Sequence, residues 1–433
     1  MIKINSYSRN SQQVLLENNL KLMYNIGMIE LLAPAGDKDK LIMAIEYGAN
    51  AVYLASKKFG LRTFAGNFEL EELKQAVEYA HKRNVKVYVT INIVPHDGDL
   101  MDLPEYVKYL ESIGVDAVIC ADLGVISIVR KTAPNLAVHV STQANITNSA
   151  TAMVFVNMGV KRLILAREMT LEEIKLLRKN IPQEIELEAF CHGAMCISHS
   201  GRCLLSNFFT GRDANRGACV QACRWNYEIR EISKESFYPI EEDNHGTYIL
   251  NSKDMCMIDH LDKLRDAGIS SIKIEGRMKT EYYVANIVNA YRKALDFLEN
   301  NKEYNLPEEI RNEVFKSSHR DYSCGFYFGD PKENLKTSLP ISTHDFVAVV
   351  LEDSKDGMAK VEMRNKFLQN EQLELLSKQK NNAIISIEKI VDMDGVELTE
   401  CKVPKQVVMI KTNENLKKYE MLRRKKWEKL IKF

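Results

Sequence analysis

The sequence predicts an α/β fold: a (β/α)8, TIM-like barrel with a cysteine-rich insertion, followed by a small antiparallel β-barrel. From Glu30 onward, short β-branched runs alternate with amphipathic helical patterns, which is typical of a parallel sheet. Eight such units fill about 270 residues, close to the usual size of this barrel. From His344 the apolar pattern changes to the two-residue period of strands with one exposed face.

The elements of the first barrel follow one another in a regular order. Each strand candidate runs into a polar or glycine-containing turn, and several helix candidates end in Gly or Asn, as helix C-termini often do. A doubly wound open sheet is the alternative, but no G-x-G-x-x-G follows the first strand. The strand candidates are residues 29–36, 51–56, 86–92, 117–122, 137–143, 162–168, 185–190 and 271–277, and the helix candidates include residues 37–48, 70–84, 103–114 and 171–182.

The rest of the chain divides into three further parts. We expect an N-terminal extension over residues 1–28, a barrel over 29–300 with its insertion at about 191–256, a connection over 301–343 and the small barrel over 344–433. Between Lys411 and Phe433 there are nine Lys or Arg and three Glu, a net charge of +6. This basic tail, centred on residues 416–433, is either a solvated helix end or a patch that binds phosphates.

Composition excludes several classes of protein. The 433 residues include 59 Lys or Arg and 59 Asp or Glu, and 45% are hydrophobic, so neither a disordered polyelectrolyte nor a globally basic nucleic-acid binder is indicated. We find no signal-peptide pattern and no run of about 18 apolar residues, and we expect a soluble, cytoplasmic protein without a membrane partner. In a reducing compartment, clustered cysteines indicate a metal site or a catalytic thiol.

Polar residues follow the strand candidates, where a barrel of this kind places its active site. Strand ends are commonly polar because they meet solvent, and Glu275 beside Arg277 also fits a simple bracing pair. Two arginines nevertheless indicate an anionic substrate, since guanidinium pairs with carboxylate or phosphate through two hydrogen bonds. We expect His192 and Glu275 to be catalytic, and the substrate-binding candidates are Arg167, Arg277, Asn92 and Gln143.

Five of the nine cysteines lie in residues 191–225. Cys191 ends a buried strand, where it acts as a small hydrophobe. The other four are separated by six, fifteen and three residues, and the lack of a C-x2-C pair weakens a structural zinc site without excluding it. Four thiolates are also the ligand set of a [4Fe-4S] cluster. Scattered buried thiols are the remaining explanation for Cys196, Cys203, Cys219 and Cys223.

The segment ELEAFCHGAMCISHSGRCLLSNFFTGRDANRGACVQACRW resembles the signature of the collagenase-like peptidases of family U32, and in particular their tRNA-hydroxylating branch. Further matches are LLAPAGD, NSKDM, IKIEGRMKT and HRDYSCGF, in the expected order. The resemblance extends from about residue 29 to the C-terminus, and the first 28 residues depart from the family pattern.

This resemblance implies a tRNA-modifying enzyme that hydroxylates the wobble uridine to 5-hydroxyuridine, with tRNA as partner and prephenate as hydroxyl donor. It also implies a [4Fe-4S] cluster bound by Cys196, Cys203, Cys219 and Cys223. In the related ubiquinone-hydroxylating branch the fourth cysteine comes later in the chain, which leaves Cys256 as a weaker candidate.

Other functions stay open at this point. The family name suggests a peptidase, although the sequence has neither H-E-x-x-H nor G-x-S-x-G, and a protease pair of Cys191 or Cys196 with His192 is disfavoured because neighbours on a strand face opposite sides. A non-enzymatic RNA-binding protein with a structural cluster is another alternative. The last alternative is an iron–sulfur hydroxylase that acts on ribosomal RNA or on a quinone precursor.

Overall fold

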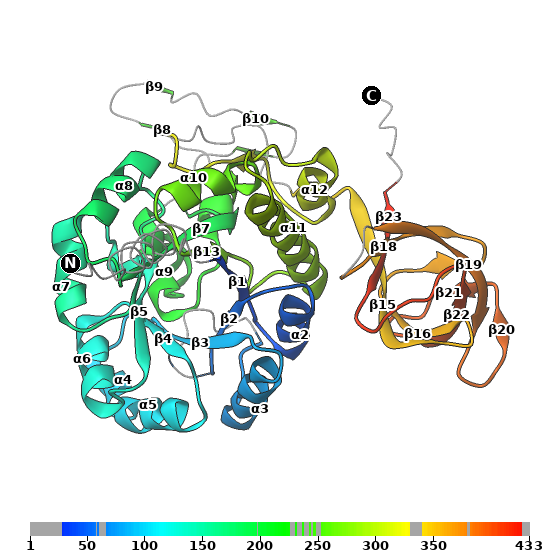
Figure 1. The fold of residues 1–433 in the computed structure, drawn as a ribbon, viewed down its shortest axis with the longest axis horizontal. Helices are drawn as coiled ribbons and strands as arrows, with labels where there is room; N and C mark the ends of the chain where they lie inside the picture. Colours follow the sequence, from blue (N-terminus) through cyan, green and yellow to red (C-terminus); the bar gives the residue numbers. More distant parts are fainter. Residues whose placement is uncertain are drawn as a thin grey trace, which may run out of the picture.

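The computed structural model describes residues 28–57, 59, 66–196, 198–225, 253–329, 340–378 and 382–426, with four two-residue strands between residues 230 and 247. Figure 1 shows a larger barrel wrapped by helices and a smaller, all-β barrel beside it. The predicted extension lies outside the described residues except for Met28. Among the described helices, none combines the length and the apolar character needed to cross a membrane.

The larger barrel confirms the predicted parallel fold. Eight strands pair in chain order, and the ring closes where β13 pairs with both β1 and β7. All these pairings are parallel (Figure 1). The strands are almost entirely buried. The strands are β1 (Glu30–Pro34), β2 (Ala51–Leu54), β3 (Lys86–Ile91), β4 (Ala117–Cys120), β5 (Ala137–Val140), β6 (Arg162–Ile164), β7 (Glu186–Ala194) and β13 (Ser271–Ile274).

Helices surround the ring, and their starts use side-chain caps. The Asp37 carboxylate accepts a hydrogen bond from Lys40 N, and Thr170 forms a capping box with Glu173. Several helices stop a few residues before the predicted ends, because Gly48 and other terminal residues adopt positive φ angles. The helices are α2 (Lys38–Glu46), α3 (Leu70–His81), α4 (Asp97–Leu100), α5 (Leu103–Ser112), α6 (Leu123–Thr132), α7 (Ser149–Asn157), α8 (Leu171–Lys179), α10 (Leu261–Asp266), α11 (Glu281–Asn300) and α12 (Glu308–Glu313).

The insertion begins and ends on the barrel itself. After β7 the chain forms short helical turns and α9 (Leu205–Thr210). It returns to the larger barrel as β12 (Asp254–Cys256). This strand pairs antiparallel with the end of β7 and parallel with β14 (Tyr322–Ser323). The short turns are η2 (His199–Gly201), η3 (Ala214–Arg216) and η4 (Ala222–Arg224).

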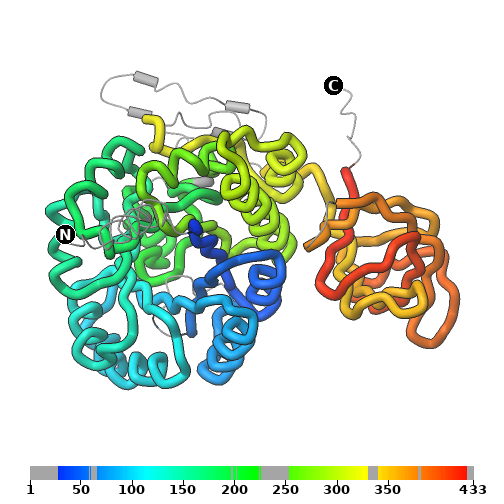
Figure 2. Tube along the Cα trace, in the orientation of Figure 1, coloured from blue at the N-terminus to red at the C-terminus, as the bar shows by residue number. Residues whose placement is uncertain are grey.

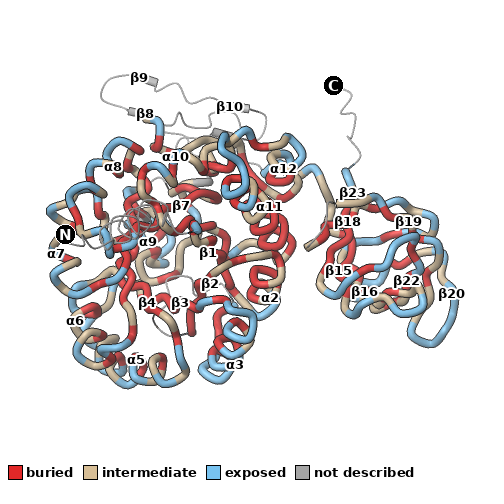
Figure 3. The backbone as a smooth tube through the Cα atoms, viewed as in Figure 1, coloured by how far each residue is buried: buried red, intermediate tan, exposed pale blue. Residues whose placement is uncertain are grey.

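The N-terminal half of the barrel interior is closed by buried charges rather than by apolar side chains alone. Figure 3 shows the strands as a buried ring. Inside it, the Arg162 guanidinium contacts Glu30 at 2.6 Å and Glu188 at 2.9 Å, and Lys273 Nζ donates to Glu188 at 3.1 Å. Each buried charge therefore has a partner of opposite sign, which limits the cost of burying it.

The small barrel is also confirmed. Six antiparallel strands form a ring in the order β18–β23–β15–β16–β22–β19, and pairing of β18 with β19 closes it. In Figure 2 this orange-to-red part lies beside α11 and α12 of the larger barrel. Its strands are β15 (His344–Lys355), β16 (Met358–Met363), β18 (Gln372–Leu376), β19 (Ala383–Val391), β22 (Val407–Thr412) and β23 (Met421–Lys425).

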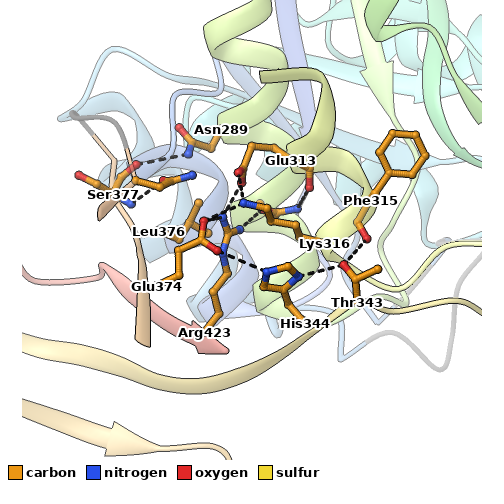
Figure 4. Close-up of polar contacts among 12 residues, drawn as sticks. Asn289, Glu313, Phe315, Lys316, Thr343, His344, Glu374, Leu376, Ser377 and Arg423 are labelled. Atoms are coloured by element: carbon orange, nitrogen blue, oxygen red, sulfur yellow. Dashed lines mark hydrogen bonds and ion pairs between the residues drawn. The ribbon is translucent and has the colours of Figure 1, made fainter. Parts of the chain in front are cut away.

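A buried arginine joins the two barrels (Figure 4). Arg423, from β23, is fully buried and donates to Glu313 of α12 at 2.7 Å, to Glu374 of β18 at 2.6 Å and to Asn286 of α11 at 2.6 Å. Lys316 contacts both carboxylates at 2.7 Å. Although burial alone raises the pKa of Glu374, hydrogen bonds from His344 and Arg423 outweigh it and hold that pKa well below its ordinary value.

The predicted basic tail requires a correction. Residues 421–425 form β23, which lies between β15 and β18, so they are a strand of the barrel and not an appendage. Arg423 is buried, and Arg424 pairs with Glu371 at 2.6 Å. Much of the positive charge is thus neutralised within the fold, and truncation after Asn415 would remove a central strand. Residues 427–433 of the predicted tail lie outside the described residues.

We predict that Arg423→Ala lowers the free energy of unfolding by about 3–5 kcal/mol, because it removes the buried guanidinium from the Glu313 and Glu374 carboxylates and leaves Lys316 to neutralise both. The neighbouring Arg424→Ala is the matched control, since its side chain is 26% exposed, and we expect a loss of about 1 kcal/mol or less. Urea unfolding of both variants measures the difference. Equal losses would contradict the central role of Arg423.

Candidate functional site

A cavity of about 110 Å³ opens at the C-terminal ends of the barrel strands and continues under the cysteine-rich insertion. It unites side chains from β3, β5, β6 and β13 with side chains of the insertion, so most of the predicted site residues do converge. Of these, Asn92, Gln143, Arg167, Glu275, Arg277, Cys196, Cys203, Cys219 and Cys223 all line the cavity.

The four cysteines form one wall of this cavity. All are half-buried, and none is in a disulfide. The amide of Leu205 donates to Cys203 Sγ at 3.4 Å, and the amide of Gln221 donates to Cys219 Sγ at 3.3 Å. Backbone amides directed at sulfur stabilise thiolates and are among the contacts that tune iron–sulfur clusters.

Four thiols around one cavity are the donor types of a [4Fe-4S] cluster and also of a four-cysteine zinc site. Four thiolates around one zinc ion stand about 2.3 Å from it and so crowd one another. Among the described residues, no three Cys, His, Asp or Glu side chains converge closely enough to hold one ion. A cluster binds each cysteine through a different iron, and the four cysteines line one cavity.

Arg167 links the cysteine wall to the barrel. It is 7% exposed, it donates to the Ala194 carbonyl at 3.3 Å, and its guanidinium lies 5.1 Å from the centre of the Phe190 ring. Burial by itself lowers the pKa of Arg167, but interactions with Cys196 and then Glu275 outweigh it and raise that pKa. The residue therefore remains a cation inside the cavity.

Two close contacts fix the loop that carries Glu275 and Arg277. A Cβ atom added to Gly193, whose φ is +112°, would lie 2.5 Å from the Glu275 carbonyl oxygen, and one added to Gly36 would lie 2.3 Å from that of Arg277. Both positions therefore require glycine. Arg277 is held by Asn67 at 2.5 Å and by Thr90 at 3.4 Å.

The two amides form a pair. Asn92 Nδ2 donates to Gln143 Oε1 at 3.0 Å, and Gln143 is 4% exposed. Its Nε2 is a buried donor for which no hydrogen-bond acceptor is found among the described residues. Because Gln143 also lines the cavity, this donor is available to an acceptor atom of a bound molecule.

Some cavity residues were not identified from the sequence. Lys273 adds a third cation, 4% exposed, whose ammonium lies 4.4 Å from the centre of the Tyr53 ring. A signal was present: Ser271, Lys273 and Glu275 place a polar residue at every second position of a strand that is otherwise apolar. Ser200, which hydrogen-bonds Glu168 at 2.7 Å, gave no comparable signal.

His192 does not line the cavity and needs correction as a catalytic candidate. Its side chain is 1% exposed, with Nδ1 3.3 Å from the Tyr291 hydroxyl and Nε2 3.4 Å from that of Tyr322. Burial lowers the pKa of His192 to about 3, so the ring is neutral.

Cys256, the alternative fourth cluster ligand, is also absent from the cavity lining. Its Sγ lies 3.8 Å from the same Tyr291 hydroxyl.

The geometry also disfavours a protease pair. Burial raises the pKa of Cys191 well above its ordinary value, so this thiol is not a ready nucleophile. Pairing of β7 with β13 shifts by one residue beside Cys191, so the expected strict alternation of faces does not hold there. The argument against this pair is thus burial and not strand alternation.

Residues 36–337 match peptidase family U32, and residues 342–423 match the C-terminal domain of that family. The chain belongs to peptidase family U32. The first match spans the larger barrel from the end of β1 onward, with its insertion, and the second spans the small barrel into β23.

Several relatives carry functional names, and three of them illustrate the range. The chain is 37% identical to tRNA hydroxylation protein P1 of Bacillus subtilis, over 92% of this chain and 95% of the relative. It is 35% identical to tRNA hydroxylation protein P of Escherichia coli, over 81% and 87%. It is also 37% identical to the 23S rRNA 5-hydroxycytidine C2501 synthase of Escherichia coli, over 62% of this chain and 39% of that protein.

We predict that His192→Gln makes stability less dependent on pH. Below about pH 6.5 the unfolded chain binds a proton at His192, whereas the native protein does not until about pH 3, so stability falls as the pH falls, by up to about 1.4 kcal/mol per pH unit. The variant lacks this component. Urea unfolding between pH 7 and 4.5 measures it, and buried His139 contributes equally to both proteins. Identical pH profiles would contradict a buried neutral His192.

Proposed function

We propose that this protein is a tRNA-modifying enzyme that hydroxylates the wobble uridine to 5-hydroxyuridine, with prephenate as hydroxyl donor and a [4Fe-4S] cluster held by Cys196, Cys203, Cys219 and Cys223. The observation that carries the proposal is a single cavity in which four cysteines meet arginines and an amide pair. RNA hydroxylation, the coarser statement, is supported by the names of relatives that this chain matches over most of their length.

The cations in the cavity support a dicarboxylate co-substrate. Arg167 and Arg277 present planar guanidinium groups, which pair with carboxylates through two hydrogen bonds, and Lys273 adds charge at the base of the cavity. Lys273 is already partly neutralised by Glu188. We therefore assign recognition of the prephenate carboxylates to the two arginines.

The amide pair supports recognition of a nucleobase. Gln143 Nε2 offers a donor that a carbonyl oxygen can accept, and uracil carries carbonyl oxygens at both O2 and O4. Cytosine has an amino group at position 4, which cannot accept this hydrogen bond. Cytidine of ribosomal RNA is the second candidate substrate, favoured by the likeness to the 23S rRNA synthase. If the Gln143 donor faces position 4 of the base, it selects uridine over cytidine, whereas the O2 carbonyl is common to both bases.

The cysteine wall would hold the cluster directly above the barrel. When bound, a [4Fe-4S] cluster supplies one-electron redox chemistry at iron. The protein groups have other tasks: the amides of Leu205 and Gln221 orient thiolates, and Arg167 offsets negative charge at Cys196. A base must leave its stack to enter so enclosed a cavity, which suits an unpaired loop nucleotide.

The proposal is tested by mass spectrometry of tRNA nucleosides from a deletion strain that carries the gene or its variants. We predict that Ala in place of Cys196, Cys203, Cys219 or Cys223 abolishes both the brown iron–sulfur absorbance and 5-hydroxyuridine. Cys401→Ala is the control, because Cys401 is buried in the small barrel core, and it should retain both. Modification of 23S rRNA cytidine, with tRNA unchanged, would favour the second candidate.

A second prediction separates the arginines from the cysteines. Arg167→Lys keeps the charge but loses the planar fork, so the KM for prephenate should rise by about tenfold or more while iron content stays normal. Arg178→Lys is the control, since that arginine is bonded to backbone carbonyls of residues 181 and 185 and does not line the cavity. An unchanged KM in Arg167→Lys would remove this residue from prephenate binding.

A further inference from the structure

The cysteine-rich insertion exposes a group of large apolar side chains beside the cavity. Leu204 is 73% exposed, Phe208 82%, Phe209 45% and Trp225 42%. The three rings are neighbours: the centres of Phe208 and Phe209 lie 5.2 Å apart, and those of Phe209 and Trp225 lie 6.2 Å apart. We call these four residues the aromatic rim.

Both ends of the aromatic rim are tied to the cavity wall. Leu204 directly follows Cys203, and Trp225 comes two residues after Cys223, and both cysteines line the cavity. Figure 1 shows α9, which carries Phe208 and Phe209, over the ring of barrel strands. A chain entering the cavity from this side would therefore contact the rim.

The insertion holds these rings outward rather than folding them inward. Ser206 of α9 is 1% exposed, and its hydroxyl donates to Ala218 O at 3.4 Å and accepts from Val220 N at 3.1 Å. This contact turns the opposite side of α9, with Phe208, to solvent. Exposed rings that pack on one another beside a cavity wall are typical of a binding surface.

Charge around the aromatic rim identifies the kind of partner. Residues 198–225 contain four Arg and one Asp, a net charge of +3, in a chain whose overall net charge is zero. Arg202 and Arg212 are exposed. Arg216 instead holds the insertion on the barrel through Asp99, at 2.7 and 3.0 Å. The positive charge that reaches solvent here complements phosphate.

We propose that the aromatic rim stacks unpaired bases of an RNA loop that flank the nucleotide entering the cavity, while Arg202 and Arg212 contact the phosphates. Rings with cationic neighbours are the usual means of binding single-stranded nucleic acid, because every base has a face on which an aromatic ring can stack. This inference rests on the proposed function, since it supplies the loop that such an enzyme must hold.

The test uses the full-length holoprotein and two synthetic RNAs: a hairpin with a seven-nucleotide uridine-containing loop, and a blunt duplex with the same stem. Phe208→Ala should weaken hairpin binding by about fivefold or more, while duplex affinity and iron content stay at wild-type values. Phe208→Tyr keeps a stacking ring and should restore affinity to within about twofold. Phe328→Ala removes a ring that is 56% exposed and outside the aromatic rim, and should have no effect.

The outcomes separate the two proposals. Hairpin affinity equal to wild type in Phe208→Ala, or equal losses for hairpin and duplex, would overturn the stacking role. If Phe208→Ala leaves hairpin affinity unchanged but abolishes binding of a protein partner, the aromatic rim binds that partner, and the stacking role is again contradicted. If hairpin binding depends on the aromatic rim but no hydroxylated product forms, the stacking role is supported and the proposed function is contradicted.

Discussion

Pairing between β7 and β13 is the contact on which the rest of the structure depends. These strands lie about 80 residues apart in the chain, and their parallel register, with Ser271 opposite Glu188, closes the ring. Closure brings the insertion that leaves β7 next to the loop that follows β13. The cysteine wall and the Glu275–Arg277 loop thus share one cavity only because these two strands meet.

The two ends of the larger barrel's interior carry different kinds of side chains. Toward the N-terminal end, Arg162 is matched by the carboxylates of Glu30 and Glu188, and Glu188 also holds Lys273 at the base of the cavity, so this part serves stability. At the C-terminal end, Arg167, Arg277 and the Gln143 amide face a cavity. A site of this kind needs rigid support below it, since misplacement of a binding group by about 1 Å is costly in rate.

The fold was largely predictable because it depends on local patterns. All eight barrel strands and the strand runs of the small barrel follow from short apolar periods and turn residues. Asn92, Gln143, Arg167, Glu275 and Arg277 were predicted from one rule, that strand ends carry the site, and all five line the cavity. The same rule failed for His192, because β12 extends the sheet beside β7 and the ring is enclosed by Tyr291 and Tyr322. Sequence spacing does not reveal such an added strand.

The tail was misjudged for a related reason. Charge counts treat residues 411–433 as one basic run, yet Arg423 faces inward to carboxylates from α12 and β18, which are distant in sequence. This arrangement also bears on synthesis at the ribosome. The small barrel lacks one strand of its ring, and Glu313 and Glu374 lack the Arg423 guanidinium, until β23 has been translated. Domains usually fold as units as they emerge from the ribosome, so the larger barrel can close early. The contact between the two barrels is completed only when β23, which carries Arg423, has been made.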